Sequence, residues 1–216
     1  MVHNLGMQNS LVSQFVAELR NVNIQNDRLR FRRNLERLGE IFAYEISKHL
    51  NWHEAEIPTP LGTARSHILA EQPVVASILR AGLAMHQGLL NYFDRADNAF
   101  IAAYRKHDKD GSFHINLEYI TSPELKDRIL IIADPMLATG SSLTLTLQKI
   151  IHLGAPRQIH VVTAIACTVG IDYLMRHLPD VTIWAGAVDE ELTAKAYIVP
   201  GLGDAGDLAY GDKIQE

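Results

Sequence analysis

The sequence contains a single cysteine, and this scarcity excludes a disulfide-held fold. Cys167 is the only cysteine among 216 residues, so no intrachain disulfide can form. Because it follows an apolar run and has no histidine paired with it in sequence, we interpret it as a small core residue and not as a nucleophile. The ten histidines form no HExxH helix and no Cys/His ligand cluster, which argues against a zinc site. His49 and His53, four residues apart, are interpreted as marking the exposed end of a helix.

Long apolar segments are also missing. No stretch approaches the roughly 20 apolar residues that span a bilayer. The start, MVHNLGMQNSLVSQF, lacks the basic region and continuous apolar run of a secretory signal. We therefore expect a cytoplasmic protein that makes no contact with a membrane.

Positive charge is in short supply. There are 20 lysines and arginines against 25 acidic residues, a formal net charge of -5, so no overall field attracts nucleic acid. Five arginines gather in one predicted helix, but they spread round it and no aromatic residues interleave with them. We interpret them as a solvated face, with some at a subunit contact, and expect no nucleic-acid partner. They are Arg28, Arg30, Arg32, Arg33 and Arg37.

Apolar runs alternate with helical periods along the rest of the chain. Two N-terminal helices are predicted, at about residues 11–19 and from the N-cap Asp27 towards Leu50. Near-continuous apolar strands separated by helices then indicate a mainly parallel sheet covered on both faces, an α/β fold in one domain, residues 1–216. Ligands of such a sheet lie at the carboxyl ends of its strands. The expected strands are residues 74–79, 99–104, 129–133, 159–166 and 181–184, and the expected helices are residues 83–93, 141–153 and 171–178.

Residues 104–123 break this alternation. The piece is polar, with a turn at Asp110-Gly111 between extended flanks, and is predicted to form a β-hairpin arm. An ordinary solvent-exposed hairpin and an oligomer arm both remain open.

The segment ILIIADPMLATGSS, residues 129–142, predicts a phosphate-binding turn. A short apolar strand runs into Asp134, and small residues then open a helix, whose free N–H groups and dipole favour a phosphate. Asp134 suits ribose hydroxyls or a magnesium-bound water. The alternative is a plain strand-to-helix turn with a Thr or Ser cap. The loop carries neither the Walker A ending nor the dinucleotide-binding glycine spacing.

A second glycine-rich loop lies in AYIVPGLGDAGDLAYG, residues 196–211. Uracil presents an acceptor, a donor and an acceptor along one edge, and a backbone carbonyl flanked by two N–H groups complements that pattern. Glycines let the backbone approach closely enough to supply it, although turn geometry alone could also explain them.

Both loops resemble those of uracil phosphoribosyltransferases, in the type I phosphoribosyltransferase superfamily. ADPMLATGSS is similar to the family's loop for 5-phosphoribosyl-1-diphosphate (PRPP), and YIVPGLGDAGD is similar to its uracil-binding signature. The resemblance implies the type I fold, with a C-terminal hood at about residues 185–216. Members commonly carry Gly-Gly-Ser where this chain has Gly140-Ser141-Ser142; if the middle position needs a positive φ, Ser141 would be strained.

The resemblance also implies roles for individual residues. Ile198 would offer its carbonyl to uracil, Gly203 and Ala205 their N–H groups, and Asp204 would face PRPP and its magnesium. SILRAGLAMHQGLL resembles the pyrophosphate-binding turn, with Arg80 on PRPP, although a surface salt bridge is the ordinary reading of such an arginine. Tyr104-Arg105 resembles the family's Tyr-Arg pair, whose arginine also reaches PRPP. The PRPP loop itself would comprise Asp134, Pro135, Met136, Leu137, Ala138, Thr139, Gly140, Ser141 and Ser142.

The implied reaction joins uracil to PRPP, giving UMP and pyrophosphate, with Asp134, Arg105 and Asp204 as the catalytic residues. Mg²⁺ would be held through PRPP and water, with no direct protein ligand. The family further implies a homodimer or higher homo-oligomer and allows GTP as an effector. Two alternatives remain: a phosphoribosyltransferase for another base, and a regulatory relative that binds nucleotide or RNA.

Overall fold

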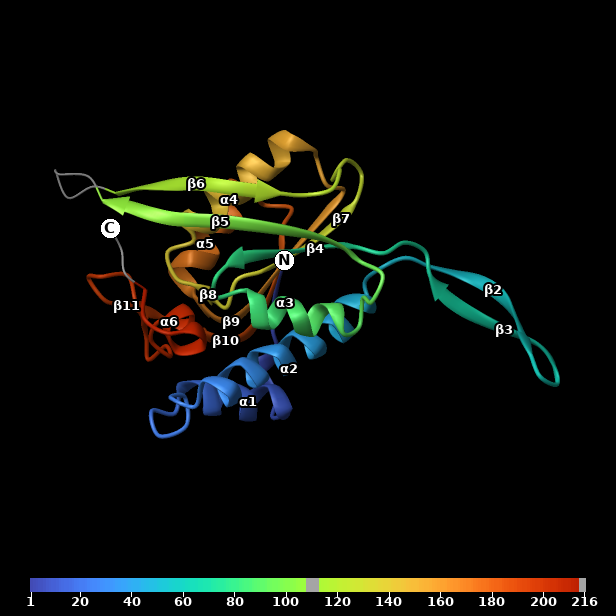
Figure 1. Ribbon diagram of the computed structural model, residues 1–216, viewed down its shortest axis with the longest axis horizontal. Helices are drawn as coiled ribbons and strands as arrows, with labels where there is room; N and C mark the ends of the chain where they lie inside the picture. Colours follow the sequence, from blue (N-terminus) through green and yellow to red (C-terminus); the bar gives the residue numbers. More distant parts are fainter. Residues whose placement is uncertain (108–112, 214–216) are drawn as a thin grey trace.

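The computed structural model describes residues 1–107 and 113–213, and the side chains of these residues outside 103–118. A mixed, mainly parallel sheet forms its centre (Figure 1). The strand order is β1-β10-β9-β7-β4-β5-β6, with the short β8 beside β9, and only the β5–β6 pair in this sheet is antiparallel. The strands are β1 (Val2–Asn4), β4 (Val74–Leu79), β5 (Asp97–His107), β6 (Phe113–Thr121), β7 (Ile129–Ala133), β8 (Met136–Leu137), β9 (Gln158–Cys167) and β10 (Thr182–Asp189). The expected α/β fold is confirmed.

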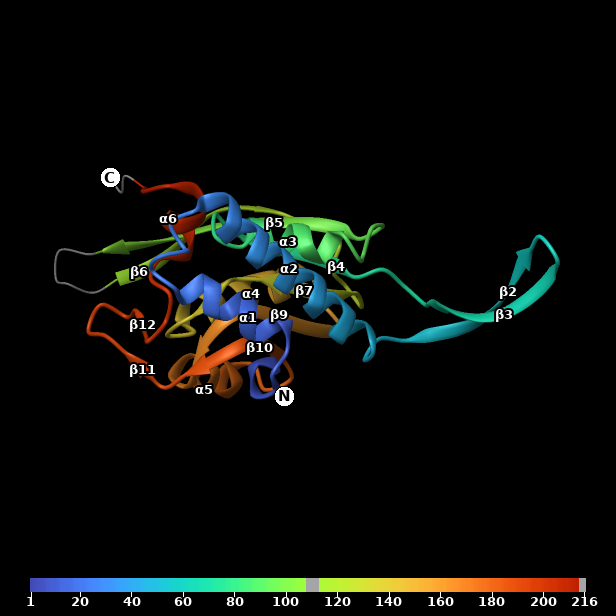
Figure 2. The same ribbon diagram turned by 90° about the horizontal axis from the view of Figure 1, so that it is seen from below.

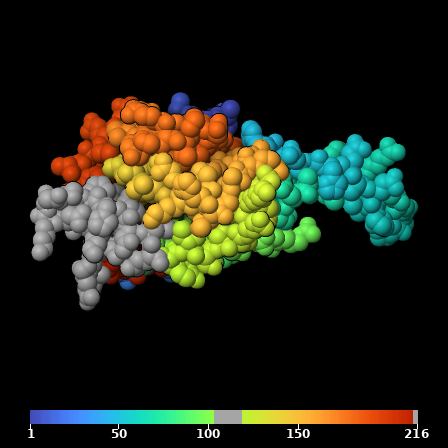
Figure 3. Space-filling view, turned by 90° about the horizontal axis from the view of Figure 1, so that it is seen from above, coloured from blue at the N-terminus to red at the C-terminus, as the bar shows by residue number. Residues whose placement is uncertain are grey.

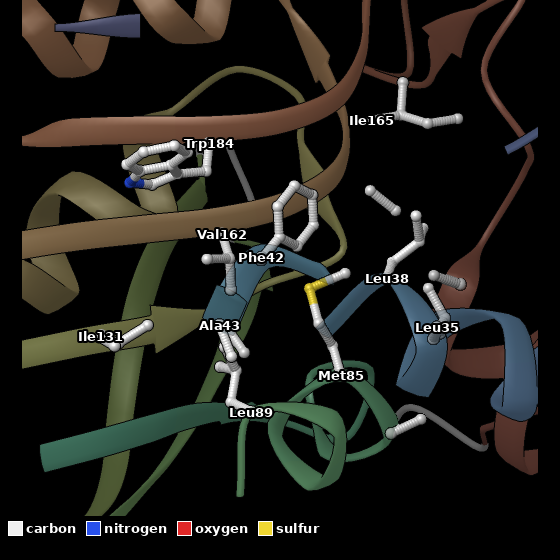
Figure 4. Packing of buried hydrophobic residues seen from close by; sticks show 14 of the residues in the cluster. Leu35, Leu38, Phe42, Ala43, Met85, Leu89, Ile131, Val162, Ile165 and Trp184 are labelled. Carbon is white, nitrogen blue, oxygen red and sulfur yellow. The ribbon is translucent and has the colours of Figure 1, made fainter. Parts of the chain in front are cut away.

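Helices cover both faces of this sheet, and each face has its own apolar core. On one face α1 (Leu11–Arg20), α2 (Arg28–Ser47) and α3 (Leu83–Leu90) pack over the sheet, and on the other lie α4 (Ser141–Leu153) and α5 (Thr168–His177). In Figure 4, Phe42 and Ala43 of α2 lie between Met85 and Leu89 of α3 and Val162 and Trp184 of the sheet. Cys167 is fully buried and unpaired, as predicted.

Local caps explain where α1 and α2 begin. The side chain of Asp27 accepts a hydrogen bond from the backbone N–H of Arg30, and Ser10 accepts one from Val12, so each caps a helix start. The predicted bounds of β4, β7 and α4 agree with the structure. None of the helices in the described residues is long and apolar enough to cross a membrane.

A hairpin that we did not predict projects from the body. Strands β2 (Trp52–Thr59) and β3 (Gly62–Leu69) pair only with each other and extend well beyond the sheet (Figures 1 and 3). The placement of His53 at a helix end is therefore wrong, because His53 lies on β2; His49 follows the last turn of α2. The predicted arm at residues 104–123 falls within the β5–β6 pair, and its turn at Asp110-Gly111 lies outside the described residues.

The C-terminal part folds over the end of the sheet. It holds the short pair β11 (Glu191–Leu192) and β12 (Ile198–Val199), followed by the helix α6 (Ala205–Tyr210). Figure 2 shows α6 beside the first turns of α2. The N- and C-terminal regions therefore meet at the edge where β4 and β7 end.

Candidate active site

Two loops leave the sheet side by side. Strands β4 and β7 are parallel neighbours, and Ser77 pairs with Ala133, so the turn after β4 and the loop after β7 start at the same edge. The chain proceeds from β4 to β5 on one side and reaches β7 on the other, which makes this edge a topological switch point. In α/β sheets, ligands bind in the crevice at such a point.

The loop after β7 is held in a defined path. The N–H of Asp134 donates to the Val162 carbonyl at 3.1 Å, and the Asp134 carboxylate accepts from the N–H of Met136 at 3.3 Å. Gly140 then has a φ of +78°, and a Cβ at this position would clash with the carbonyl oxygen of Gly170 at the start of α5. The condition for strain at Ser141 is not met, because the left-handed residue is Gly140 and Ser141 is the first residue of α4.

The start of α4 offers donors to an anion. Its N-cap, Gly140, has no side chain to cap the helix, and the N–H of Ser141 makes only a long hydrogen bond, at 3.4 Å, to Oγ1 of Thr139. The hydroxyls of Thr139 and Ser141 lie 2.8 Å apart. A cavity of about 130 Å³ opens here, lined by Asp134, Met136, Leu137, Ala138, Thr139, Gly140, Ser142 and Leu143. Most of the predicted PRPP loop thus surrounds one hollow at a helix N-terminus, where a phosphate is favoured; Pro135 and Ser141 do not line it.

The turn after β4 contacts the C-terminal hood. Nη2 of Arg80 donates to Oδ1 of Asp207 at 2.9 Å, and Nη1 donates to the Gly211 carbonyl at 3.1 Å. Arg80 therefore does form an ion pair, but its partner belongs to the hood, 127 residues away in sequence. Two of the motifs singled out in the sequence are in direct contact.

The name glycine loop is used here for residues 198–205, which comprise β12, the turn after it and the first residue of α6. Gly201 and Gly203 have φ values of +54° and +96°. Ile198 and Ala205 are buried, whereas Gly203 is exposed. The loop borders a cavity of about 390 Å³ between the hood and the α1–α2 connection. This cavity is lined by Gln25, Asn26, Arg28, Leu202, Gly203, Asp204, Asp207, Leu208 and Asp212.

Asp204 caps α6 and stays ionised. Its Oδ1 accepts from the N–H groups of Gly206 at 2.9 Å and Asp207 at 3.0 Å, and its Oδ2 accepts from Nζ of Lys213 at 2.9 Å. Burial alone would raise the pKa of Asp204, but the hydrogen bonds from Lys213 and the two N–H groups outweigh it and lower that pKa. The hood therefore presents a carboxylate at neutral pH.

The arginines of α2 do not all face solvent. Arg30 and Arg33 are exposed, as predicted, and they pair with Glu18 and Glu36. The prediction is wrong for Arg32, which is half-buried and donates to the Ala209 carbonyl of α6 at 2.7 Å. A guanidinium bound at the negative end of a helix stabilises it.

Some residues of this region were not predicted from the sequence. One predicted residue, Arg105, has a side chain outside the described residues. Gln25 and Gly170 have no local signal, because each contacts a distant part of the chain, at Leu202 and Gly140 respectively. Asn26 was also missed, and it lines the larger cavity. Arg105 lies on β5, and its predicted role stays a prediction. Within the described part, no group of three or more His, Cys, Asp or Glu side chains could hold a metal ion.

Comparisons with known proteins agree with this geometry. The family model for uracil phosphoribosyltransferase matches residues 6–212. A uracil phosphoribosyltransferase of Porphyromonas gingivalis is 51% identical over 214 residues, covering 99% of both chains. One from Methanothermobacter thermautotrophicus is 39% identical over 183 residues, covering 84% of this chain and 83% of the other.

Solved structures agree as well. A protein of Aquifex aeolicus superposes with a TM-score of 0.87 at 34% identity, and the match covers 100% of both chains. A hypoxanthine phosphoribosyltransferase of Staphylococcus aureus, at 11% identity and a TM-score of 0.50 over 86% of this chain and 84% of the other, shares the type I phosphoribosyltransferase fold. The chain belongs to the uracil phosphoribosyltransferase family.

Proposed function

We propose that this protein transfers the 5-phosphoribosyl group of PRPP to N1 of uracil, giving UMP and pyrophosphate. The observation that carries the proposal is the contact between Arg80 and Asp207, at 2.9 Å. It joins the turn predicted to bind pyrophosphate to the hood predicted to bind the base. Both reactants would thus be held at one edge of the sheet, next to the loop after β7.

Three parts of the site would bind PRPP. Its 5′-phosphate would lie at the N-terminus of α4, against backbone N–H groups of the first turn and the side chains of Thr139 and Ser142, which line the hollow. The carboxylate of Asp134 would accept hydrogen bonds from the ribose hydroxyls. Arg80, with Arg105, would bind the pyrophosphate group. Because the carboxylate of Asp207 now bonds Arg80, the pyrophosphate must share or replace that contact.

Uracil would be recognised by backbone groups of the glycine loop. Ile198 would accept from uracil N3–H, while the N–H groups of Gly203 and Ala205 would donate to its two carbonyl oxygens. Cytosine presents a different order of donors and acceptors, so a buried group would be left unpaired. A site that reads a base by hydrogen bonds rejects the mismatched base strongly.

The reaction needs little covalent help from the protein. The bond from C1′ of the ribose to the pyrophosphate oxygen breaks with its electron pair, a bond from uracil N1 to C1′ forms, and the N1 proton is lost. Orientation of two bound reactants can supply much of the rate. The cations Arg80 and Arg105 would stabilise charge on the departing pyrophosphate.

Magnesium fits this site as a partner of PRPP. Mg²⁺ commonly uses one or two carboxylates and completes its shell with substrate phosphates and water, so a dedicated cluster of protein ligands is not required. Asp204 is ionised and half-buried in the hood, which suits an interaction through a bound water. The ion would supply positive charge to the pyrophosphate. GTP regulation and a cytoplasmic setting stay predictions from the sequence.

The proposal includes a second copy of the chain, bound through the β2–β3 hairpin. Isolated two-stranded hairpins are marginally stable in water. This one also exposes apolar side chains, with Trp52 at 47%, Leu61 at 101% and Ile68 at 41% exposure. Light scattering should report twice 24.1 kDa or a higher multiple. The variant Leu61→Lys should weaken the assembly, and a monomeric wild-type protein would contradict this part of the proposal.

Pyrophosphate release with PRPP and Mg²⁺ tests the reaction. Uracil should give release and UMP, whereas cytosine, hypoxanthine, adenine and the base-free control should not. Release with a different base would overturn our interpretation of the glycine loop. No release with any base from folded protein would favour the regulatory alternative, which salt-dependent RNA binding would then support.

A further inference from the structure

A largely buried ion pair contacts the glycine loop. Arg20, the last residue of α1, and Asp189, the last residue of β10, form a bidentate pair, with Nη1 to Oδ2 and Nη2 to Oδ1 both at 2.7 Å. The side chain of Asp189 is 8% exposed and that of Arg20 is 22% exposed. Neither residue belongs to the motifs that the sequence analysis identified.

Both members of the pair also bond the backbone of Gly201. Nη1 of Arg20 donates to the Gly201 carbonyl at 3.0 Å, and the Gly201 N–H donates to Oδ2 of Asp189 at 3.0 Å. The two polar groups of one residue are therefore fixed by the two ends of one ion pair. Next along the chain, Gln25 donates to the Leu202 carbonyl at 3.1 Å.

Gly201 stands at the centre of the loop that would bind the base. It lies three residues after Ile198 and two before Gly203. Its φ is +54°, and a Cβ on it would clash with the carbonyl oxygen of Ile198. Whatever fixes the peptide groups of Gly201 thus also fixes the position of the Ile198 carbonyl relative to the Gly203 N–H.

Stability alone is a weak explanation for such a pair. Removing two charges from water is costly, and apolar residues of similar volume often serve a fold as well or better. By contrast, a planar guanidinium group that binds a carboxylate through two hydrogen bonds is held in a fixed orientation, in addition to the attraction between the charges. This arrangement suits a role in orienting the loop.

We propose that Arg20 and Asp189 are positioning residues that hold the glycine loop in its uracil-binding conformation before uracil arrives. The proposal rests on the proposed function. Neither side chain touches the base; both act through Gly201. Most of the PRPP site is built by α4 and the turn after β4, and loss of the pair should leave it intact. Asp204, the one residue of the glycine loop assigned to PRPP, is held separately by its own hydrogen bonds with Gly206, Asp207 and Lys213. The effect of losing the pair should therefore fall on uracil and not on PRPP.

The variant Asp189→Asn tests this role, because it keeps the shape of the side chain and removes its charge. We expect the KM for uracil to rise about 10- to 100-fold, the scale of a small misplacement of a binding group, while the KM for PRPP changes less than about 2-fold. The matched control is Asp97→Asn. Asp97 pairs with Arg128 at 2.9 Å at the amino end of β5, away from the loop, so both KM values should stay at the wild-type level.

Hydrogen exchange of the peptide covering residues 199–204, measured without substrates, gives a readout independent of turnover. Exchange should be faster in Asp189→Asn than in the wild type and unchanged in Asp97→Asn. If Asp189→Asn does not fold, Arg20→Lys replaces it, since lysine keeps the charge but cannot make the forked contact.

The outcomes separate the two proposals. A wild-type protein that fails to release pyrophosphate with uracil contradicts the proposed function, and the exchange experiment then still decides whether the pair orders the loop. An active wild type whose variant raises both KM values equally, or whose loop exchanges at the wild-type rate, overturns the positioning role.

Discussion

The buried imidazole of His160 makes the stability of this protein depend on pH. Nε1 of Trp184 donates to Nδ1 of His160 at 3.1 Å, so the neutral ring carries its proton on Nε2. That Nε2 is buried and has no hydrogen-bond partner in the described part of the chain. Protonation would break the bond from Trp184 and leave a charge in the core. Burial first, and then the charges of His49 and His3, lower the pKa of His160 to about 4.

The sign and size of the effect follow from this pKa. The unfolded chain binds a proton at His160 below about pH 6.5, whereas the folded protein does so only near pH 4, so acid favours unfolding. The contribution is fully present above pH 6.5 and is lost as the pH falls towards 4. Each pH unit between the two pKa values costs about 1.4 kcal/mol, which gives a loss of about 3 kcal/mol at pH 4.

Urea unfolding followed by circular dichroism, at fixed protein concentration and several pH values, measures this loss. The variant His160→Asn removes the titrating group and keeps an acceptor for Trp184. Its unfolding free energy should be lower than that of the wild type at neutral pH, because a smaller side chain leaves a cavity, but should fall by about 3 kcal/mol less on acidification. The control His152→Asn removes an exposed imidazole. Parallel curves for wild type and His160→Asn would refute the reasoning.

Three further changes test the core and the loop after β7. Gly140→Ala should lower the free energy of unfolding by about 1–2 kcal/mol for the left-handed backbone alone, and by more because of the clash with Gly170. Urea unfolding should therefore occur at a lower concentration, and PRPP binding should weaken. Wild-type stability would contradict the role of the positive φ. Asp134→Ala should lower kcat/KM for PRPP about 100-fold in protein whose circular dichroism is unchanged, and an unaltered rate would remove Asp134 from the mechanism. Phe42→Ala should lower the unfolding free energy by about 3–5 kcal/mol, because this ring is completely buried between α3 and the sheet; a loss below 1 kcal/mol would contradict that packing.

Local signals in the sequence were sufficient for much of the fold. The strand before Asp134 is an uninterrupted apolar run, and the helix after Gly140 has a clear apolar face, so their bounds could be predicted. Asp27 likewise marks the start of α2, because its side chain caps a free N–H. Each of these features depends on neighbours within a few residues.

The hairpin at residues 52–69 could not be found in this way. A strand that packs on a core alternates apolar and polar residues, but this hairpin is exposed on both faces, and its strands carry Glu54, Glu56, Pro58 and Arg65 among few apolar residues. Apolar alternation is limited to short pieces such as Glu54-Ala55-Glu56-Ile57, which is too little to distinguish a strand from an exposed loop. The choice of apolar and polar residues in this hairpin would make sense only from the surface that it contacts, and a single sequence does not reveal that contact.

Some features of the candidate site could likewise be predicted from local sequence, and others could not. The glycine loop and the loop after β7 stand out because a turn that approaches a ligand closely requires small residues. The ion pair of Arg20 and Asp189 joins residues 169 positions apart, so no window of sequence contains both. Arg32 was misinterpreted for the same reason, since its partner Ala209 lies 177 residues later.

These long-range contacts have a consequence for folding during synthesis. Arg20 and Arg32 leave the ribosome early, but Asp189 is made only at the end of β10, the last strand of the central sheet in the chain, and Ala209 follows later still. A nascent chain can therefore pack α1 to α3 on the sheet while the glycine loop still lacks its anchors. Contacts of high sequence separation also form slowly. We expect the ability to bind uracil to be the last property that a newly made or refolding chain acquires.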